Sequence, residues 1–456
     1  MRDLSAIVKA YDIRGVVGEQ LDEAVVRDIG AAFADLVGGT EVVVGHDMRD
    51  SSPALAAAFG DGVTSRGVDV VSIGLASTDM LYFASGRLHC PGAMFTASHN
   101  PACYNGIKLC RAGAAPVGQD SGLDAIREAV ERGVAPGPGG GGVTERDMLD
   151  DYAGFLRSLV DVTGIRPLRM VVDAGNGMAG HTVPAVFEGL PVDLVPLFFE
   201  LDGTFPNHEA NPLDPANLVD LQQAVRDRGA DIGLAFDGDA DRCFVVDERG
   251  EPVTPSAIAA LVATRALAAE PGGTVIYNLI TSRAVPEIVA EAGGKPVRTR
   301  VGHSFIKQTM AETGAIFGGE HSAHYYFRDF WWADSGMLAS LHVLAALGSQ
   351  QQPCSELMAR YRRYAASGEI NSTVGDQQGR MDAVRSHFAA RDGARVDELD
   401  GLTVELPGAC WFNLRPSNTE SLLRLNVEGR SHADVDGLRD EVLALVRHQP
   451  PGEQER

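Results

Sequence analysis

The sequence predicts an α/β protein of several domains, and three observations support this fold class. Short apolar segments typical of buried strands recur along the chain, with helical patterns between them. Polar loops follow several of these segments directly, as expected at the carboxyl edge of mostly parallel sheets. The length of 456 residues corresponds to about three domains, with three to four plausible.

The first predicted helix covers residues 21–36, where apolar residues recur at helical spacing, and it ends at Gly38-Gly39. The apolar runs that follow at 41–46 and 68–74 predict two strands. Four later segments predict further strands with their loops: 169–177, 231–239, 273–280 and 314–320. The recurrence of strand and loop suggests duplicated domains.

Composition changes along the chain suggest where domains end. The segment 133–142 is too rich in Pro and Gly for regular structure, and it lacks the Lys and Ser/Thr of a P-loop, so we expect a surface loop. We predict three α/β domains at 1–150, 151–250 and 251–364. The last segment, 365–456, contains strand-like WFNLRP and SLLRLNVEG followed by a helix, and it predicts a smaller α+β domain.

Charge and cysteine content exclude several classes of protein. The net charge of −23 argues against nucleic acid or an anionic membrane as a partner. No stretch approaches the roughly 18 apolar residues of a membrane span, and the first residues lack the apolar core of a signal peptide. Six cysteines without a CxxC pair or zinc spacing indicate reduced thiols. We therefore expect a cytoplasmic protein, either a monomer or a weak dimer.

The strongest local motif is DGDADR at 237–242, which directly follows an apolar strand. Asp237, Asp239 and Asp241 would repel one another without a cation, and oxygen ligands suit a hard ion such as magnesium. The alternatives are an acidic surface turn or a structural calcium loop. An EF-hand is disfavoured because Arg242 occupies the sixth position, where that loop needs Gly, although Glu248 falls at the twelfth.

Three further loops carry polar groups, and each is weak by itself. FTASHNP at 95–101 places Ser98 beside His99, where an ordinary turn is the simpler interpretation. RPSNTE at 415–420 has the donors of a phosphate clamp, but it also fits a helix N-cap. GGEHSAH at 318–324 offers a carboxylate and a hydroxyl suited to paired sugar hydroxyls, or it is a polar connection.

Taken together and in order, these motifs resemble the α-D-phosphohexomutase family, which includes bacterial phosphomannomutases and phosphoglucomutases. The resemblance spans nearly the whole chain: KAYDIRG (9–15), TASHNP (96–101), NGIKL (105–109), DAGNG (173–177), DGDADR (237–242), GHSFIK (302–307), GEHSAH (319–324) and RPSNTE (415–420). It implies four domains around a central cleft, three of them α/β with mixed sheets and the last a smaller α+β lid.

The resemblance also implies roles for individual residues. Ser98 would be the phosphoserine, and one of its phosphate oxygens would join Asp237, Asp239 and Asp241 in holding Mg²⁺. Groups expected around the transferring phosphoryl or the reacting hydroxyl are Arg14, Lys108, Arg242, His303 and His324. Groups expected to bind substrate are Tyr11, His99, Glu320, Ser322, Arg415, Ser417, Asn418 and Thr419, with Glu320 and Ser322 on the sugar 3- and 4-hydroxyls.

The implied activity is the interconversion of mannose 6-phosphate and mannose 1-phosphate through a hexose 1,6-bisphosphate, which also serves as activator. Glucose phosphates are possible further substrates. Asn278 to Thr281 stand where several relatives carry a Lys, His321 and Ala323 depart from a common GEMSGH pattern, and Ser421 replaces a frequent Pro. These departures leave the sugar specificity and the rate open, and they do not touch the metal loop or Ser98, which define the reaction class. The alternatives are a phosphoglucomutase or phosphoglucosamine mutase, a phosphoserine-type metallophosphatase, or a non-catalytic sugar-phosphate-binding protein.

Overall fold

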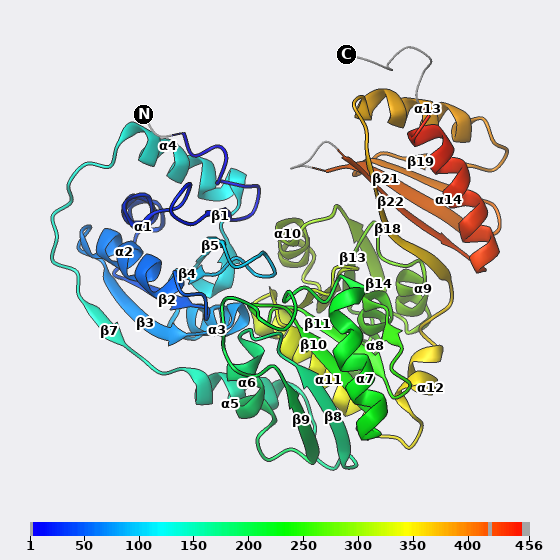
Figure 1. The fold of residues 1–456 in the computed structure, drawn as a ribbon, viewed down its shortest axis with the longest axis horizontal. Helices are drawn as coiled ribbons and strands as arrows, with labels where there is room; N and C mark the ends of the chain where they lie inside the picture. The colour runs from blue at the N-terminus through cyan, green and yellow to red at the C-terminus, as the bar shows by residue number, and fades with distance from the viewer. Residues whose placement is uncertain (1–2, 418–421, 449–456) are drawn as a thin grey trace.

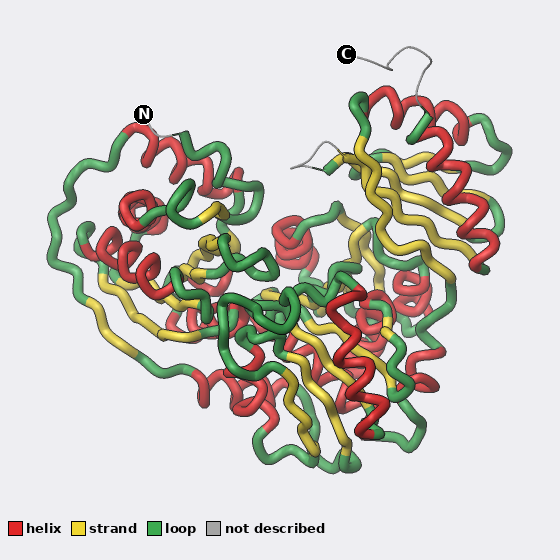
Figure 2. The backbone as a smooth tube through the Cα atoms, viewed as in Figure 1, coloured by secondary structure: helices red, strands yellow, loops and turns green. Residues whose placement is uncertain are grey.

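The computed structural model describes residues 3–417 and 422–448, and they form four domains in chain order. Figure 1 shows the first domain in blue to cyan and the fourth in orange and red, with the second and third between them. Three domains are built on mixed sheets with helices packed beside them, and the fourth on an antiparallel sheet (Figure 2). The predicted fold class is confirmed.

The first domain contains β1 (Ile13–Val16), α1 (Glu23–Val37), β2 (Glu41–His46), α2 (Ser52–Thr64), β3 (Asp69–Leu75), α3 (Thr78–Leu88), β4 (Gly92–Phe95), β5 (Tyr104–Arg111), β6 (Ala115–Pro116), α4 (Asp124–Arg132) and β7 (Val143–Glu145). The sheet order is β1-β5-β4-β2-β3-β7, with β6 beside β5. The strands β4, β2, β3 and β7 run parallel, whereas β5 is antiparallel to β4. Parallel β2 and β4 therefore end at the same edge, where the Ser98 loop begins.

The predicted first helix begins two residues later than expected, because Asp22 caps it. The Asp22 side chain accepts a hydrogen bond from the backbone N–H of Val25. The Pro- and Gly-rich segment 133–142 has no helix or strand, as the composition predicts, and most of it is exposed. It connects α4 to β7, which adds a parallel strand to the edge of the sheet at β3.

The second domain contains α5 (Leu149–Leu159), β8 (Leu168–Asp173), α6 (Ala179–Phe187), β9 (Val192–Leu197), α7 (Val219–Arg228), β10 (Ile232–Phe236), β11 (Cys243–Asp247) and β12 (Pro252–Val253). Its sheet has the order β12-β11-β10-β8-β9. The strands β9, β8 and β10 are parallel, and β11 returns antiparallel to β10. The β10–β11 connection is the DGDADR loop.

The third domain contains α8 (Pro255–Ala269), β13 (Thr274–Asn278), α9 (Ala284–Glu291), β14 (Lys295–Thr299), α10 (His303–Thr313), β15 (Phe317–Gly319), β16 (Tyr325–Phe327), β17 (Ala333–Asp334), α11 (Gly336–Gly348) and α12 (Cys354–Ala359). The sheet order is β14-β13-β15-β16-β17. Parallel β15 turns into antiparallel β16 through the GEHSAH loop.

The fourth domain contains β18 (Ala365–Thr373), α13 (Gln377–Ala389), β19 (Arg395–Asp397), β20 (Leu402–Leu406), β21 (Cys410–Pro416), β22 (Leu422–Gly429) and α14 (His432–Val446). Its antiparallel sheet has the order β18-β22-β21-β20-β19. The apolar face of α14 packs on this sheet through Val435, Leu438 and Val442, as the sequence pattern predicts.

The clusters of buried apolar side chains do not correspond one to one with the four sheets. One large cluster runs from α3 of the first domain through the second and third domains. The fourth domain has a core of its own. It meets the third domain through polar contacts that include Arg283 N–H to Glu428 at 2.9 Å and Val301 N–H to Asp400 at 3.0 Å. The α3 side of the first domain therefore shares a continuous interior with the second and third domains, whereas α1 and α2 pack over a separate core of the first domain.

Candidate active site

Three buried carboxylates stand at the DGDADR loop, between β10 and β11. Asp237, Asp239 and Asp241 are at most 1% exposed, and one carboxylate oxygen from each lies within 4.8 Å of the other two. The flanking segments are antiparallel strands, and Glu248 accepts hydrogen bonds from Ser355, away from the loop. The EF-hand interpretation is therefore wrong.

Ser98 meets this loop at the end of β4. Its hydroxyl donates to Asp237 Oδ2 at 2.8 Å and lies 3.2 Å from Arg242 Nη2. The backbone carbonyl of Ser98 packs directly on Gly238, where an added Cβ would lie 2.4 Å from that oxygen. Only glycine at position 238 therefore lets the two loops approach this closely. Ser98 itself has a φ of 51°, in the left-handed region.

Three basic side chains surround the hydroxyl and the carboxylates. Arg242 pairs with Asp237 at 2.7 Å, and Lys108 pairs with Asp239 at 2.6 Å and with Asp241 at 2.5 Å. His99 Nδ1 lies 3.2 Å from Ser98 Oγ and also contacts Arg242. Burial, followed by the charge of Arg242, lowers the pKa of His99 well below its usual range, so His99 is neutral.

Burial raises the pKa of Asp237, and repulsion from Asp241 and Asp239 adds to the rise, while the charge of Arg242 opposes it. Burial acts in the same direction on Asp239, but the ion pair with Lys108 outweighs it and lowers the pKa of Asp239. The buried environment therefore disfavours having all three of these carboxylates ionised at once in the absence of a cation.

The donor set fits a hard divalent cation. Oδ1 of Asp239 and Oδ1 of Asp241 are buried and accept no hydrogen bond from the described residues. Both atoms belong to carboxylates, which are the ligands that Mg²⁺ and Ca²⁺ prefer. The other oxygen of Asp239 accepts from Thr78 Oγ1 at 2.6 Å, which fixes the orientation of the carboxylate. The site is thus suited to a metal ion.

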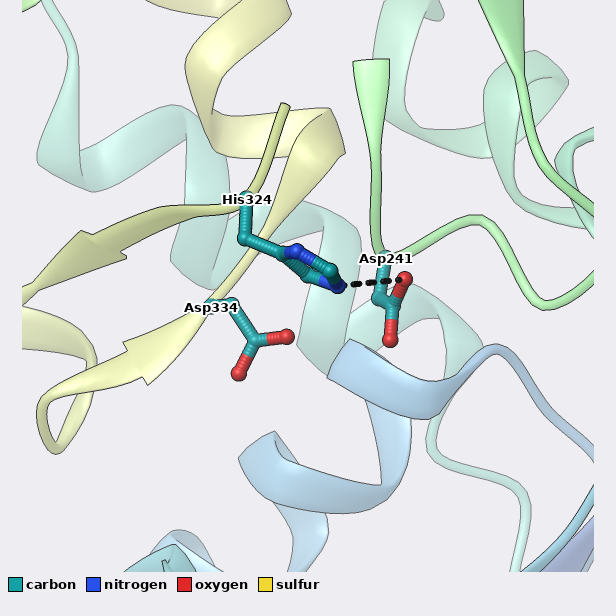
Figure 3. Close-up of side chains that lie close together, drawn as sticks. All are labelled: Asp241, His324 and Asp334. Atoms are coloured by element: carbon teal, nitrogen blue, oxygen red, sulfur yellow. Dashed lines mark ion pairs between the residues drawn. The ribbon is translucent and has the colours of Figure 1, made fainter. Parts of the chain in front are cut away.

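The GEHSAH loop reaches the metal loop through His324. His324 Nε2 lies 3.7 Å from Asp241 Oδ1, and Figure 3 shows the imidazole pointing toward that carboxylate, with Asp334 nearby. Ser322 Oγ lies 3.1 Å from His324 Nδ1 and donates to Glu320 Oε2 at 3.0 Å. The structure therefore brings Glu320, Ser322 and His324 together with the three aspartates.

The remaining predicted residues lie in the first, third and fourth domains. Arg14 donates to Asn100 Oδ1 at 2.6 Å, in the Ser98 loop, and pairs with Asp12. Tyr11 lies against the third domain, with its ring centroid 6.4 Å from that of Phe305. Burial raises the pKa of Tyr11, and the charges of Asp400 and Glu320 add to the rise.

Arg415 lies on β21 and pairs with Glu369 at 3.3 Å; Ser417 follows as the last residue before the gap in the described chain. Asn418 and Thr419 lie outside the described residues, so their predicted contacts are not tested. His303 begins α10, and its side chain lies outside the described part.

Sequence reasoning missed several residues that support this site. Asn278 Nδ2 and Tyr326 Oη donate to Glu320 at 3.1 and 2.5 Å, so both of its oxygens are held. Thr78 holds Asp239, and the buried guanidinium of Arg49 lies beneath the Ser98 loop. Thr78, Asn278 and Arg49 all lie at or just beyond the carboxyl end of a strand, and that position was the available signal.

Comparison with known proteins identifies the family to which this arrangement belongs. Models of the phosphoglucomutase/phosphomannomutase alpha/beta/alpha domains I, II and III match residues 5–135, 150–250 and 254–364. The model of the C-terminal domain of the same family matches residues 369–445. The chain belongs to the phosphoglucomutase/phosphomannomutase family. It is therefore an intramolecular phosphotransferase.

Relatives cover the phosphohexomutase chain almost from end to end. A protein of Xanthomonas campestris pv. campestris named "Phosphohexose mutases" is 42% identical over 444 residues, which are 96% of this chain and 98% of that protein. The phosphomannomutase of Salmonella typhimurium is 40% identical over 452 residues, which are 97% of this chain and 98% of that protein. A crystal structure of a phosphoglucomutase/phosphomannomutase family protein from Burkholderia thailandensis superposes with a TM-score of 0.89 at 35% identity, covering 98% of both chains.

Among the described residues, no helix combines the length and the apolar character needed to cross a membrane.

Proposed function

We propose that this phosphohexomutase interconverts mannose 6-phosphate and mannose 1-phosphate, with Ser98 as the phosphate carrier and Mg²⁺ at the aspartate loop. The observation that carries the proposal is the position of Ser98 Oγ, 2.8 Å from Asp237 and 3.2 Å from Arg242. Curated relatives about 40% identical over nearly the full chain are named phosphomannomutases, which favours mannose as the sugar.

Each half-reaction moves one phosphoryl group between Ser98 and a sugar hydroxyl. The P–Oγ bond of phosphoserine breaks as a bond from phosphorus to the sugar oxygen forms, giving a hexose 1,6-bisphosphate. The hydroxyl proton passes to a base, for which His324 and His303 are the predicted candidates. The bisphosphate then turns over, and its other phosphoryl group returns to Ser98. A hexose 1,6-bisphosphate is accordingly the activator, because it can phosphorylate Ser98 in an enzyme that has lost its phosphate.

The side chains around Ser98 position the reactants and neutralise charge, which are the main contributions of a protein to phosphoryl transfer. Arg242 and Lys108 stand on either side of the carboxylates and would face the transferring group. Magnesium, when bound, would neutralise charge on the phosphoryl oxygens. The burial of Ser98, which is 5% exposed, limits access of water and thus hydrolysis of the phosphoserine.

The non-reacting end of the substrate needs separate contacts. We propose that Glu320 and Ser322 accept the sugar hydroxyls, because Asn278 and Tyr326 already fix the orientation of the Glu320 carboxylate. Arg415, with Ser417, Asn418 and Thr419, would clamp the distal phosphate. A metallophosphatase that transfers to water would have no need of this second set of groups.

The proposal predicts that Ser98→Ala abolishes turnover and removes the phosphate that intact-mass analysis finds on the wild-type enzyme.

Mannose 1-phosphate should show a higher kcat/KM than glucose 1-phosphate when both are assayed with the bisphosphate and Mg²⁺. A chelator should stop the wild-type reaction, and added Mg²⁺ should restore it.

Two outcomes would contradict these assignments. A fully active Ser98→Ala enzyme, together with a wild type that never carries phosphate, would exclude the carrier role. A higher kcat/KM for glucose 1-phosphate would keep the reaction class and replace mannose with glucose as the preferred sugar.

A further inference from the structure

Arg49 lies directly beneath the loop that carries Ser98. It follows β2, and its side chain is 1% exposed. The guanidinium donates to four backbone carbonyls of that loop: Ser98 at 3.0 Å, Asn100 at 2.7 Å, Pro101 at 2.9 Å and Tyr104 at 3.0 Å. Its Nε donates to Asp47 at 3.2 Å. All three of its nitrogens are therefore engaged.

The guanidinium is itself held rigidly from two sides. Asp47, which is fully buried, pairs with Arg49 and accepts a hydrogen bond from Ser52 Oγ at 2.6 Å. On the other side, the Phe205 ring of the second domain lies 5.0 Å from the guanidinium carbon. Gly203 approaches so closely that an added Cβ would lie 2.6 Å from Arg49 Cα. Arg49 thus connects the Ser98 loop to the domain that carries the metal loop.

The Ser98 loop needs such a support. Its backbone at Ser98 has a φ of 51°, which a residue with a Cβ adopts only at a cost of about 1–2 kcal/mol. Loop carbonyls that point inward require donors, because an unpaired buried carbonyl destabilises the conformation. Arg49 supplies donors to four of them from one planar group. Without it, the loop can relax toward an ordinary turn, which would move Ser98 Oγ away from Asp237.

We propose that Arg49 is a positioning residue that fixes the Ser98 backbone, so that the hydroxyl and its phosphate stay aligned with the aspartate loop. This inference rests on the proposed role of Ser98 as the phosphate carrier. Arg49 touches neither Ser98 Oγ nor the carboxylates of the metal loop in any described contact. Its effect is therefore on the transfer step and not on the binding of the sugar.

A lysine cannot replace this arginine, because an ammonium has three donors on one nitrogen and cannot reach carbonyls spread over a planar fork. We expect Arg49→Lys to lower kcat about 100-fold while KM for the sugar phosphate changes less than about 3-fold, since a misplacement of about 1 Å has such an effect on rate. Phosphorylation of Ser98 by the bisphosphate, followed by intact mass, should slow in parallel.

Chemical rescue separates positioning from general stability. Arg49→Ala leaves a guanidinium-sized space, and guanidinium ion at low millimolar concentration should raise its kcat about 10-fold or more. Arg157→Ala is the matched control, because Arg157 also donates to two carbonyls, Ala185 at 2.6 Å and Val186 at 3.1 Å, far from Ser98 in sequence. It should lower the melting temperature, keep kcat near the wild-type value and show no rescue.

An Arg49→Lys enzyme with wild-type kcat would overturn the inference, and so would a loss confined to KM. Rescue of Arg157→Ala to the same extent as Arg49→Ala would also overturn it. If Arg49→Ala does not fold, the kcat and KM of Arg49→Lys decide the question. A wild type without phosphate and an active Ser98→Ala enzyme would instead refute the proposed function, so the two failures are distinguishable.

Discussion

Ala323 shows how a single residue in the GEHSAH loop bears backbone strain. It is fully buried between Ser322 and His324 with a φ of 67°, in the left-handed region that favours glycine. The Ala323 N–H closes the loop by donating to the Glu320 carbonyl at 3.2 Å. The turn that presents Glu320 therefore keeps Ala323 in a backbone conformation that alanine disfavours.

At this scale we predict that Ala323→Gly raises the free energy of unfolding by about 1 kcal/mol, because glycine adopts a positive φ without steric strain. The midpoint of denaturant unfolding measures the change. Ala444→Gly is the control with opposite sign, since this exposed position lies inside α14, where glycine costs about 0.5–1 kcal/mol. A lower midpoint for Ala323→Gly would show that the turn is not strained.

The Glu320 carboxylate illustrates how neighbouring side chains define a binding group. Asn278 is itself held by Thr281 Oγ1, which donates to Asn278 Oδ1 at 2.7 Å, so the amide has one orientation available. Asn278 is the first residue of the segment 278–281, in which the family resemblance leads us to expect a lysine. Its side chain is a neutral donor to Glu320.

At the scale of elements, α1 and α2 pack unusually closely because glycines lie at their crossing. A Cβ at Gly62 would lie 2.0 Å from the carbonyl oxygen of Arg27, and one at Gly30 would lie 2.2 Å from that of Phe59. Backbone atoms cannot yield as a flexible side chain can. The distance between these two helices is therefore set by Gly30 and Gly62, which have no Cβ.

We predict that Gly62→Ala destabilises the protein by about 1–3 kcal/mol through overpacking at this crossing. Thermal unfolding measures the loss. Gly154→Ala is the matched control, because Gly154 lies inside α5 with no atom within 4 Å of the added Cβ. That change should stabilise by about 0.4–1 kcal/mol. Equal effects of the two substitutions would contradict the packing argument.

At the scale of the whole molecule, Asp79 joins three domains in one buried cluster. It accepts hydrogen bonds from Ser77 at 2.5 Å in the first domain, Tyr152 at 2.7 Å at the start of the second, and Ser335 at 2.6 Å in the third. The cluster lies within the large apolar core that these domains share. These contacts join the α3 side of the first domain to the second and third domains.

Burial raises the pKa of Asp79 to about 6, with repulsion from Asp241 adding to it, while the three hydroxyl donors oppose the rise. An unfolded aspartate titrates at about 3.9. The folded state therefore holds the proton more tightly than the unfolded state, so the contribution of this group to stability is full below about pH 4 and is lost as pH rises through about 6.

We predict that the melting temperature of the wild type, minus that of Asp79→Asn, falls as pH rises from about 4 to about 7 and is constant above. The asparagine variant does not titrate, so the difference isolates Asp79 from other groups. Both proteins are measured with the same excess of Mg²⁺, which keeps the aspartate loop in one state. A difference that does not vary with pH would contradict the raised pKa.

The sequence alone determined the fold class and the family, and it predicted which carboxylates would hold a metal ion. Strand patterns, loop positions and the order of the motifs are local properties, and they predicted DGDADR as a metal site from three alternating aspartates. Several strands, including β2 at Glu41–His46, were predicted within a residue or two.

Only the tertiary structure decided what supports those motifs. Arg49 is 49 residues from Ser98, and Thr78 is 161 residues from Asp239, so no local pattern relates either pair. Parallel β2 and β4 end at one sheet edge, which brings Arg49 to the Ser98 loop. Thr78 and Asp239 follow strands of two different sheets, and they meet where the first and second domains pack, as do Gly238 and the Ser98 carbonyl. Long-range contacts depend on which sheet edges meet, and that is a property of the folded chain as a whole.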